Sequence, residues 1–61
     1  MMNDIEQEGF DACMQGIEYE KNPHNEFFKD YIDWSDGWNQ AKLIEVMNII
    51  ELINNKKKTE M

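Results

Sequence analysis

Polar residues recur with helical spacing over residues 3–17. The positions that step by four and three along this segment are Asp4, Glu8, Asp11, Gln15 and Glu18. Such a step places them in one stripe on a helix, and Cys13 lies opposite that stripe on the apolar face. Asn3 or Asp4 is placed to cap the start by accepting hydrogen bonds from free backbone N–H groups. The pattern therefore predicts an amphipathic helix over residues 3–17.

After Ile5, one flank of this expected helix carries only small residues. Gly9, Ala12 and Gly16 lie about 100° from the polar stripe. A glycine inside a helix costs about 1 kcal/mol relative to alanine. Because two glycines carry that cost here, we expect a bulky group to approach this flank closely. A groove for the indole ring of Trp34 or Trp38 is the interpretation that this flank favours.

Residues 18–26 interrupt the helical pattern and are predicted to form a connector. Pro23 disfavours helical backbone at the residue before it, Asn22. Asn22 is alternatively the N-cap of a helix that begins with Pro23 as its first residue. The sequence leaves both interpretations open.

A second helix is predicted over residues 27–54, either continuous or broken. Its first stripe steps by three, four and three through Tyr31, Trp34, Trp38 and Ala41. Phe27, or Phe28 after a small rotation, extends this stripe backward. Asp33 or Ser35 is alternatively an N-cap, in which case the main helix begins only there.

Beyond Ala41 a second apolar stripe follows. It consists of Leu43, Val46, Ile50 and Ile53. Two short helices cannot cover both stripes, so this one is a candidate face for self-association as a homodimer, or for a partner. Three lysines at 56–58 suit a helix C-terminus, and residues 55–61 are expected to fray. The chain is thus predicted to be one small all-α domain over residues 1–61, a helix–connector–helix whose core dimerisation would complete.

Charge and composition narrow the choice of partner. The 61 residues carry a formal net charge of −7, which disfavours direct binding to nucleic acid or to an anionic membrane. One cysteine and one histidine exclude an internal disulfide and a Cys/His zinc site. The acidic N-terminus does not resemble a signal peptide, and no apolar run approaches the roughly 20 residues that span a bilayer. A cytoplasmic location is therefore expected.

The spacing of small and aromatic residues also carries a family resemblance. The order is Gly9-Phe10-x-Ala12-x-x-x-Gly16, then Asn22-Pro23, then Trp34-x-x-Gly37-Trp38-x-x-Ala41. This order resembles the ribosome modulation factor family, small proteins from bacteria and their phages, over about residues 9–41. The resemblance implies two helices joined by a connector, with the tryptophans packed against the glycine-bearing helix. It assigns the matched positions to the scaffold.

The resemblance further implies a ribosomal role, because that family binds the small ribosomal subunit near the messenger-exit region and promotes inactive ribosome dimers. The family is strongly basic, whereas this chain has Asp4, Glu6 and Glu8 where the family carries many basic residues. The segment after Glu45 is also longer and more apolar than in the family. The matched positions are scaffold residues, so no RNA-contacting residue is carried over with them.

The reactive side chains do not assemble into a catalytic set. Cys13 lies on the apolar face, which favours burial over reactivity. His24 has no nucleophile or orienting group beside it and is expected to be an exposed loop residue. The acids around Asp30, Asp33 and Asp36 lack the alternating ligands and turn glycine of a calcium loop. We therefore predict no catalytic residue, no cofactor and no metal site.

The acidic side chains are instead a candidate surface for a basic partner. That surface consists of Asp4, Glu8, Asp11, Glu18, Asp30 and Asp33. The expected function is that of a non-enzymatic binding protein, an inhibitor or adaptor from a phage or a bacterium that imitates nucleic acid and binds a positively charged protein. The alternative is a ribosome-associated factor that modulates translation during hibernation.

Overall fold

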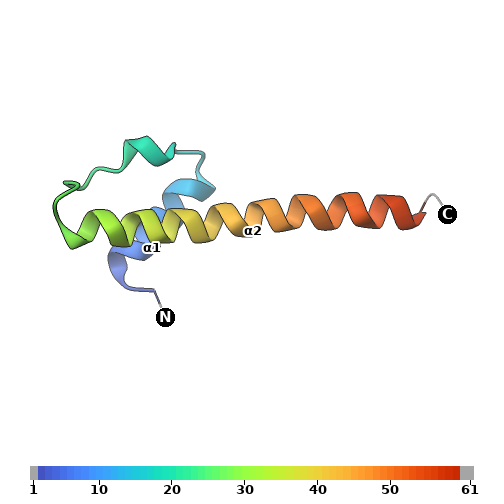
Figure 1. Cartoon of the computed structure of the whole chain (residues 1–61), viewed down its shortest axis with the longest axis horizontal. Helices are drawn as coiled ribbons and strands as arrows, with labels where there is room; N and C mark the ends of the chain where they lie inside the picture. The colour runs from blue at the N-terminus through green and yellow to red at the C-terminus, as the bar shows by residue number, and fades with distance from the viewer. Residues whose placement is uncertain (1, 60–61) are drawn as a thin grey trace.

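Residues 2–59 form two α-helices and a short 3-10 helix. The computed structural model describes residues 2–59, and the side chains of residues 2–54. Helix α1 spans Asp4–Met14, the 3-10 helix η1 spans Tyr19–Lys21, and α2 spans Lys29–Thr59 (Figure 1). No strand occurs within residues 2–59, so the predicted all-α, two-helix fold is confirmed.

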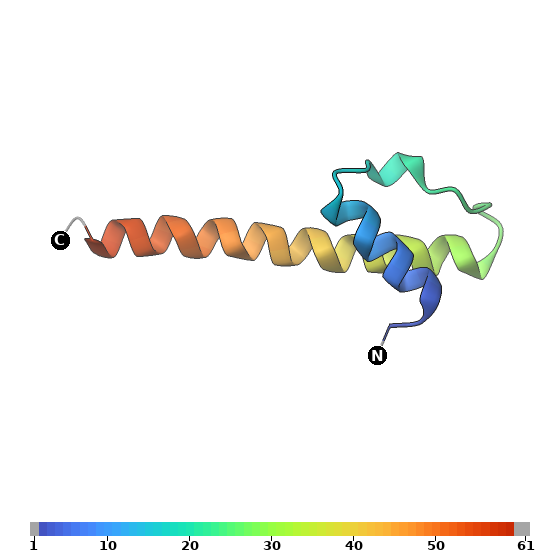
Figure 2. The ribbon, with the colours of Figure 1, turned by 180° about the vertical axis from the view of Figure 1, so that it is seen from behind.

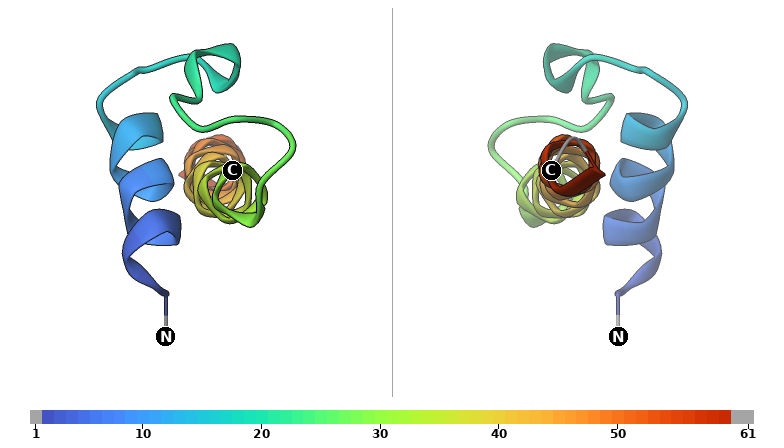
Figure 3. Two further views of the ribbon diagram at one scale, coloured as in Figure 1. Left: turned by 90° about the vertical axis from the view of Figure 1, so that its left-hand side faces the viewer. Right: turned by 90° about the vertical axis from the view of Figure 1, so that its right-hand side faces the viewer.

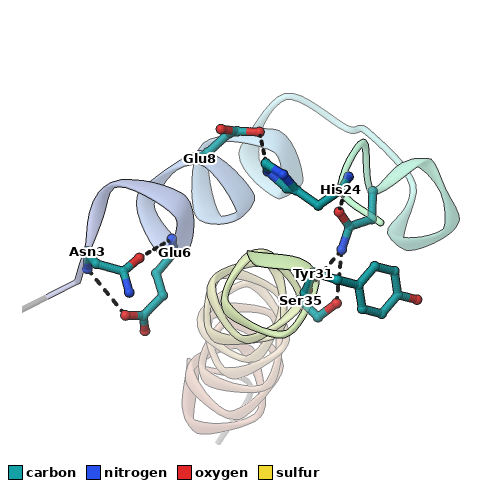
Figure 4. A network of polar contacts seen from close by, with 7 residues as sticks. Asn3, Glu6, Glu8, His24, Tyr31 and Ser35 are labelled. Atoms are coloured by element: carbon teal, nitrogen blue, oxygen red, sulfur yellow. Dashed lines mark hydrogen bonds and ion pairs between the residues drawn. The ribbon is translucent and has the colours of Figure 1, made fainter. Parts of the chain in front are cut away.

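Helix α1 begins with a reciprocal pair of hydrogen bonds. Asn3 Oδ1 accepts from the backbone N–H of Glu6 at 2.8 Å, and the backbone N–H of Asn3 donates to Glu6 Oε1 at 3.2 Å (Figure 4). This capping box satisfies two donors that the first helical turn leaves free. Of the two N-cap candidates, Asn3 is therefore the cap. The polar stripe of α1 is exposed, as the periodicity predicts.

Helix α1 ends three residues earlier than predicted, because Gly16 reverses the chain. Gly16 has φ of 83°, a left-handed conformation that glycine adopts without steric cost. Its N–H donates to the Cys13 carbonyl at 3.0 Å, and the Ile17 N–H donates to the Ala12 carbonyl at 2.9 Å. These bonds form a Schellman motif. The assignment of Gly16 to the packing seam was wrong, since apart from its two chain neighbours no described residue comes within 4 Å of the position that a Cβ of residue 16 would take.

The helices cross through two other close glycine contacts. A Cβ on Gly9 would overlap the Trp34 carbonyl oxygen, and a Cβ on Gly37 would overlap the Glu6 carbonyl oxygen. The small-residue flank thus receives the backbone of α2, and the predicted indole groove is corrected to a backbone contact. Trp34 is 1% exposed, and the other buried apolar residues around the crossing are Ala12, Cys13 and Ala41.

Helix α2 begins at Lys29, two residues later than predicted. Phe27 and Phe28 do not extend the core stripe, because they are 84% and 64% exposed. The backbone N–H groups of these two residues bond to Asn25 instead, at 2.9 and 3.0 Å. Asp33 and Ser35 lie inside α2, so neither is its N-cap. No helix begins at Pro23, which excludes the capping role considered for Asn22.

The second half of α2 projects away from the rest of the protein (Figures 1 and 2). Seen along its axis, α2 has α1 on one side and the connector around the other (Figure 3), and both lie at its N-terminal half (Figure 1). Ala41 is the last buried residue among the side chains described. The helical backbone is unbroken to Thr59, past the predicted end at residue 54; the predicted roles of the Lys56–Lys58 side chains lie outside the described side chains. Within the described residues, no helix has the length and apolar character needed to span a membrane.

Candidate partner-binding surfaces

Asn22 fastens the connector to α2. Its side-chain amide Nδ2 donates to the Tyr31 carbonyl at 3.0 Å and to Ser35 Oγ at 3.2 Å. Its Oδ1 accepts from the backbone N–H of His24 at 3.0 Å. One half-buried side chain therefore satisfies the buried hydroxyl of Ser35 and shapes the turn after Pro23.

His24 joins the connector to α1, which corrects the expectation of an exposed loop residue. Its Nε2 lies 3.1 Å from Glu8 Oε1 (Figure 4). The His24 side chain is 22% exposed and that of Glu8 is 47% exposed. Contacts made by Asn22 and His24 thus hold the connector against both helices.

The predicted acidic surface is divided among three places. Asp4, Glu8 and Asp11 remain together on the exposed side of α1, and we call these three the α1 acidic stripe. Asp11 Oδ1 also accepts from Gln7 Nε2 at 2.9 Å, which leaves the carboxylate at the surface. Glu18 leaves the stripe because the chain turns at Gly16, and its side chain lines a pocket described below.

Asp30 and Asp33 lie apart at the start of α2. Asp30 is exposed, but the Asp33 side chain is only 14% exposed. Asp33 Oδ2 lies 2.9 Å from Lys29 Nζ and accepts from Asn3 Nδ2 at 3.2 Å. The hydrogen bond from Lys29, supported by that from Asn3, lowers the pKa of the Asp33 carboxyl. Because two partners inside the protein engage this carboxylate, we remove Asp33 from the candidate surface.

A pocket of about 430 Å³ lies between the end of α1, the connector and α2. We call it the Trp38 pocket. Trp38 Nε1 donates to the Ile17 carbonyl at 2.7 Å, and the Tyr19 ring meets the indole edge-on. The acids Glu18, Glu20 and Glu45 line the same pocket with Lys42. Trp38 therefore lines an accessible pocket in addition to the scaffold role that the sequence predicts for it.

Sequence reasoning missed Tyr19, Lys42 and Glu45 as site residues. Lys42 and Glu45 are an i,i+3 pair on α2, but Tyr19 comes from the connector, and no spacing along the chain relates it to the other two. The turn at Gly16 brings Tyr19 back over Trp38, and this turn was not expected inside the predicted helix. A glycine three residues before an aromatic connector residue, Gly16 before Tyr19, is the one signal that was available.

Cys13 is buried, as predicted, with 6% of its surface exposed. Burial raises the pKa of its thiol, and the nearby charge of Glu45 raises the pKa further. A raised pKa keeps the sulfur protonated, which opposes a nucleophilic role. Among the residues described, no group of three or more histidine, cysteine or acidic side chains is arranged to hold a metal ion.

The second apolar stripe is exposed along the projecting half of α2. Leu43, Val46, Ile50 and Ile53 are 60%, 41%, 52% and 52% exposed. Further large apolar side chains are exposed beside them: Ile44, Met47, Ile49 and Leu52. Monomers rarely expose a contiguous apolar surface of this extent unless something binds there.

Comparison with protein-family models, with curated proteins and with solved structures found no match for this chain.

Proposed function

We propose that the protein is a non-enzymatic inhibitor or adaptor that acts in the cytoplasm and binds the basic surface of another protein. The observation that carries the proposal is the α1 acidic stripe, in which three carboxylates are exposed on one helix of a molecule with net charge −7. A rigid row of carboxylates imitates the charge of nucleic acid. Complementary charge speeds association and makes binding sensitive to salt.

The test is affinity capture from a bacterial lysate with the full chain as bait. The stripe variant carries Asp4→Lys with Asp11→Lys, and leaves Glu8 in place because Glu8 contacts His24. The matched control carries Glu26→Lys with Asp36→Lys, which changes the net charge equally at other exposed positions.

The wild type and the control should retain the same basic protein, which elutes as salt is raised. The stripe variant should lose that protein, and added duplex DNA or RNA should compete for it. Retention that is indifferent to salt, or equal retention by both variants, would contradict the proposal.

A ribosome-associated role is the second candidate. It is favoured by the close contact of Gly9 in α1 with the backbone of Trp34 in α2, because the resemblance to ribosome modulation factor implies that the tryptophan-bearing helix packs on the glycine-bearing helix. Sucrose-gradient sedimentation of tagged protein from growing and starved cells tests it. A protein that never travels with ribosomal particles would exclude this role.

We also propose that the projecting half of α2 associates with the same face of a second copy. The stripe of Leu43, Val46, Ile50 and Ile53 has the three-and-four spacing with which like helices interlock. The four side chains of this stripe, from 41% to 60% exposed, would enter such a contact. The head of the protein, residues 3–41, would remain free to bind the basic partner.

A further inference from the structure

The Trp38 pocket has a preformed aromatic wall. The Tyr19 and Trp38 ring centres lie 5.4 Å apart, and their planes meet at 74°. The hydrogen bond from Trp38 Nε1 to the Ile17 carbonyl holds the indole in one orientation. An indole face attracts positive charge because the ring is negative above and below its plane.

A positive charge already lies at this wall. Lys42 Nζ is 5.9 Å from the centre of the Trp38 ring and 3.4 Å from Glu45 Oε1. The side chains of Lys42 and Glu45 are 49% and 48% exposed, and exposed pairs of this kind contribute little stability. The aromatic wall therefore accommodates a cation, and the Lys42 ammonium group that lies there is bound only weakly.

The acidic side chains that line the Trp38 pocket outnumber the basic ones. Glu18 and Glu20 add two exposed carboxylates, and Lys42 is the single basic residue that lines the pocket among the side chains described. Cys13 forms an apolar part of the lining. An elongated apolar stem with a positive end would match both parts of this surface.

We propose that the Trp38 pocket binds an arginine or lysine side chain of the partner protein, which takes the place of Lys42 against the indole and pairs with Glu18 and Glu20. This inference rests on the proposed function, because it names the group of the basic partner that the pocket recognises. Arginine fits best, since its planar guanidinium stacks on a ring while its N–H groups pair with carboxylates. Lys42 acts as a built-in competitor.

The experiment is an NMR titration of the full ¹⁵N-labelled chain with a short arginine-containing peptide. The same peptide with citrulline is the control, because citrulline keeps the planar shape and lacks the charge. The arginine peptide should shift the indole N–H signal of Trp38 saturably, and less so at higher salt. Citrulline should leave the signal in place. An equal response to both peptides, or no saturable shift of this signal, would overturn the inference.

Charge variants locate the binding. The double variant Glu18→Gln with Glu20→Gln should lower the affinity for the arginine peptide by about five-fold or more, which is the equivalent of one favourable ion pair. Glu26→Gln with Asp36→Asn removes the same charge at other exposed positions and should leave the affinity within about two-fold. Equal losses in the two double variants would overturn the pocket as the site.

Removing the charge of Lys42 should change the affinity for the arginine peptide in the opposite direction. Lys42→Met should raise the affinity for the arginine peptide by a few fold. Lys29→Met removes the same charge at the start of α2 and should leave that affinity unchanged. If both lysine variants tighten binding equally, the effect is general attraction and the inference fails. Saturable shifts confined to α1 near Asp4 and Asp11 would also overturn it, while leaving the proposed function intact. Loss of the captured protein in the stripe variant but not in its matched control, together with arginine binding at Trp38, would support both.

Discussion

Gly9 lies against the backbone of Trp34 so closely that no side chain fits between them. The reciprocal contact is made by Gly37 on the backbone of Glu6. The two contacts bring α1 and α2 together at their crossing, where Trp34 is buried almost completely. The packing of the small core therefore requires glycine, which has no side chain beyond a hydrogen atom, at both position 9 and position 37.

Gly9→Ala should destabilise the protein by at least about 2 kcal/mol, because the added methyl group must push one helix backbone away from the other. Gly16→Ala is the matched comparison. It should cost about 1 kcal/mol, since Gly16 has positive φ but open space around it. Urea unfolding followed by circular dichroism measures both. Equal costs would show that the helices do not depend on close approach at Gly9.

Asn22→Ala should lower the free energy of unfolding by about 1–3 kcal/mol, because it leaves the buried hydroxyl of Ser35 without its amide partner. Asn39→Ala, at an exposed position of α2, should change stability by less than about 0.5 kcal/mol. Thermal unfolding of the two variants makes the comparison. An Asn22→Ala protein as stable as the Asn39→Ala protein would show that the folded connector does not depend on the hydrogen bonds of the Asn22 side chain.

Asp33 should give the folded protein a component of stability that depends on pH. Its folded-state pKa is lowered, by Lys29 first, so the ionised form is favoured by folding. The stabilisation is therefore present above the ordinary carboxyl pKa of about 3.9 and is lost as pH falls through the lower folded-state value. Asp33→Asn should reduce the loss of stability between about pH 6 and pH 3, as measured by urea unfolding. Asp30→Asn removes the same charge from an exposed position, and the prediction fails if both variants follow the wild-type pH profile.

The exposed stripe on α2 should produce self-association that rises with protein concentration. Ile50→Glu should shift the protein toward monomer, because a carboxylate would be buried without a partner in the contact. Asn48→Glu adds the same charge at a polar position of the same helix and should have a smaller effect. Sedimentation equilibrium distinguishes these outcomes. A wild-type chain that stays monomeric at high concentration would remove the predicted interface.

The sequence predicted the second-helix core stripe better than the ends of the helices. Trp34 and Ala41 are buried and Tyr31 and Trp38 half-buried, as a helical period of 3.6 requires. The same period extends the stripe to Phe27, or to Phe28 after a small rotation, but α2 begins only at Lys29. Periodicity describes residues within a helix and contains no information on where backbone hydrogen bonding starts.

The fate of the glycines shows what the sequence by itself determined and what it did not. Local pattern was sufficient to predict two helices, a connector around Pro23, the buried Cys13 and an unmatched apolar stripe beyond Ala41, because each follows from neighbours along the chain. Gly9 and Gly16 looked alike at that level. Only the tertiary structure decided that Gly9 admits the backbone of Trp34 and that Gly16 turns the chain, since one role depends on a segment 25 residues away and the other on local φ. That turn also carries Glu18 and Tyr19 to Trp38, so the Trp38 pocket exists only in the folded chain.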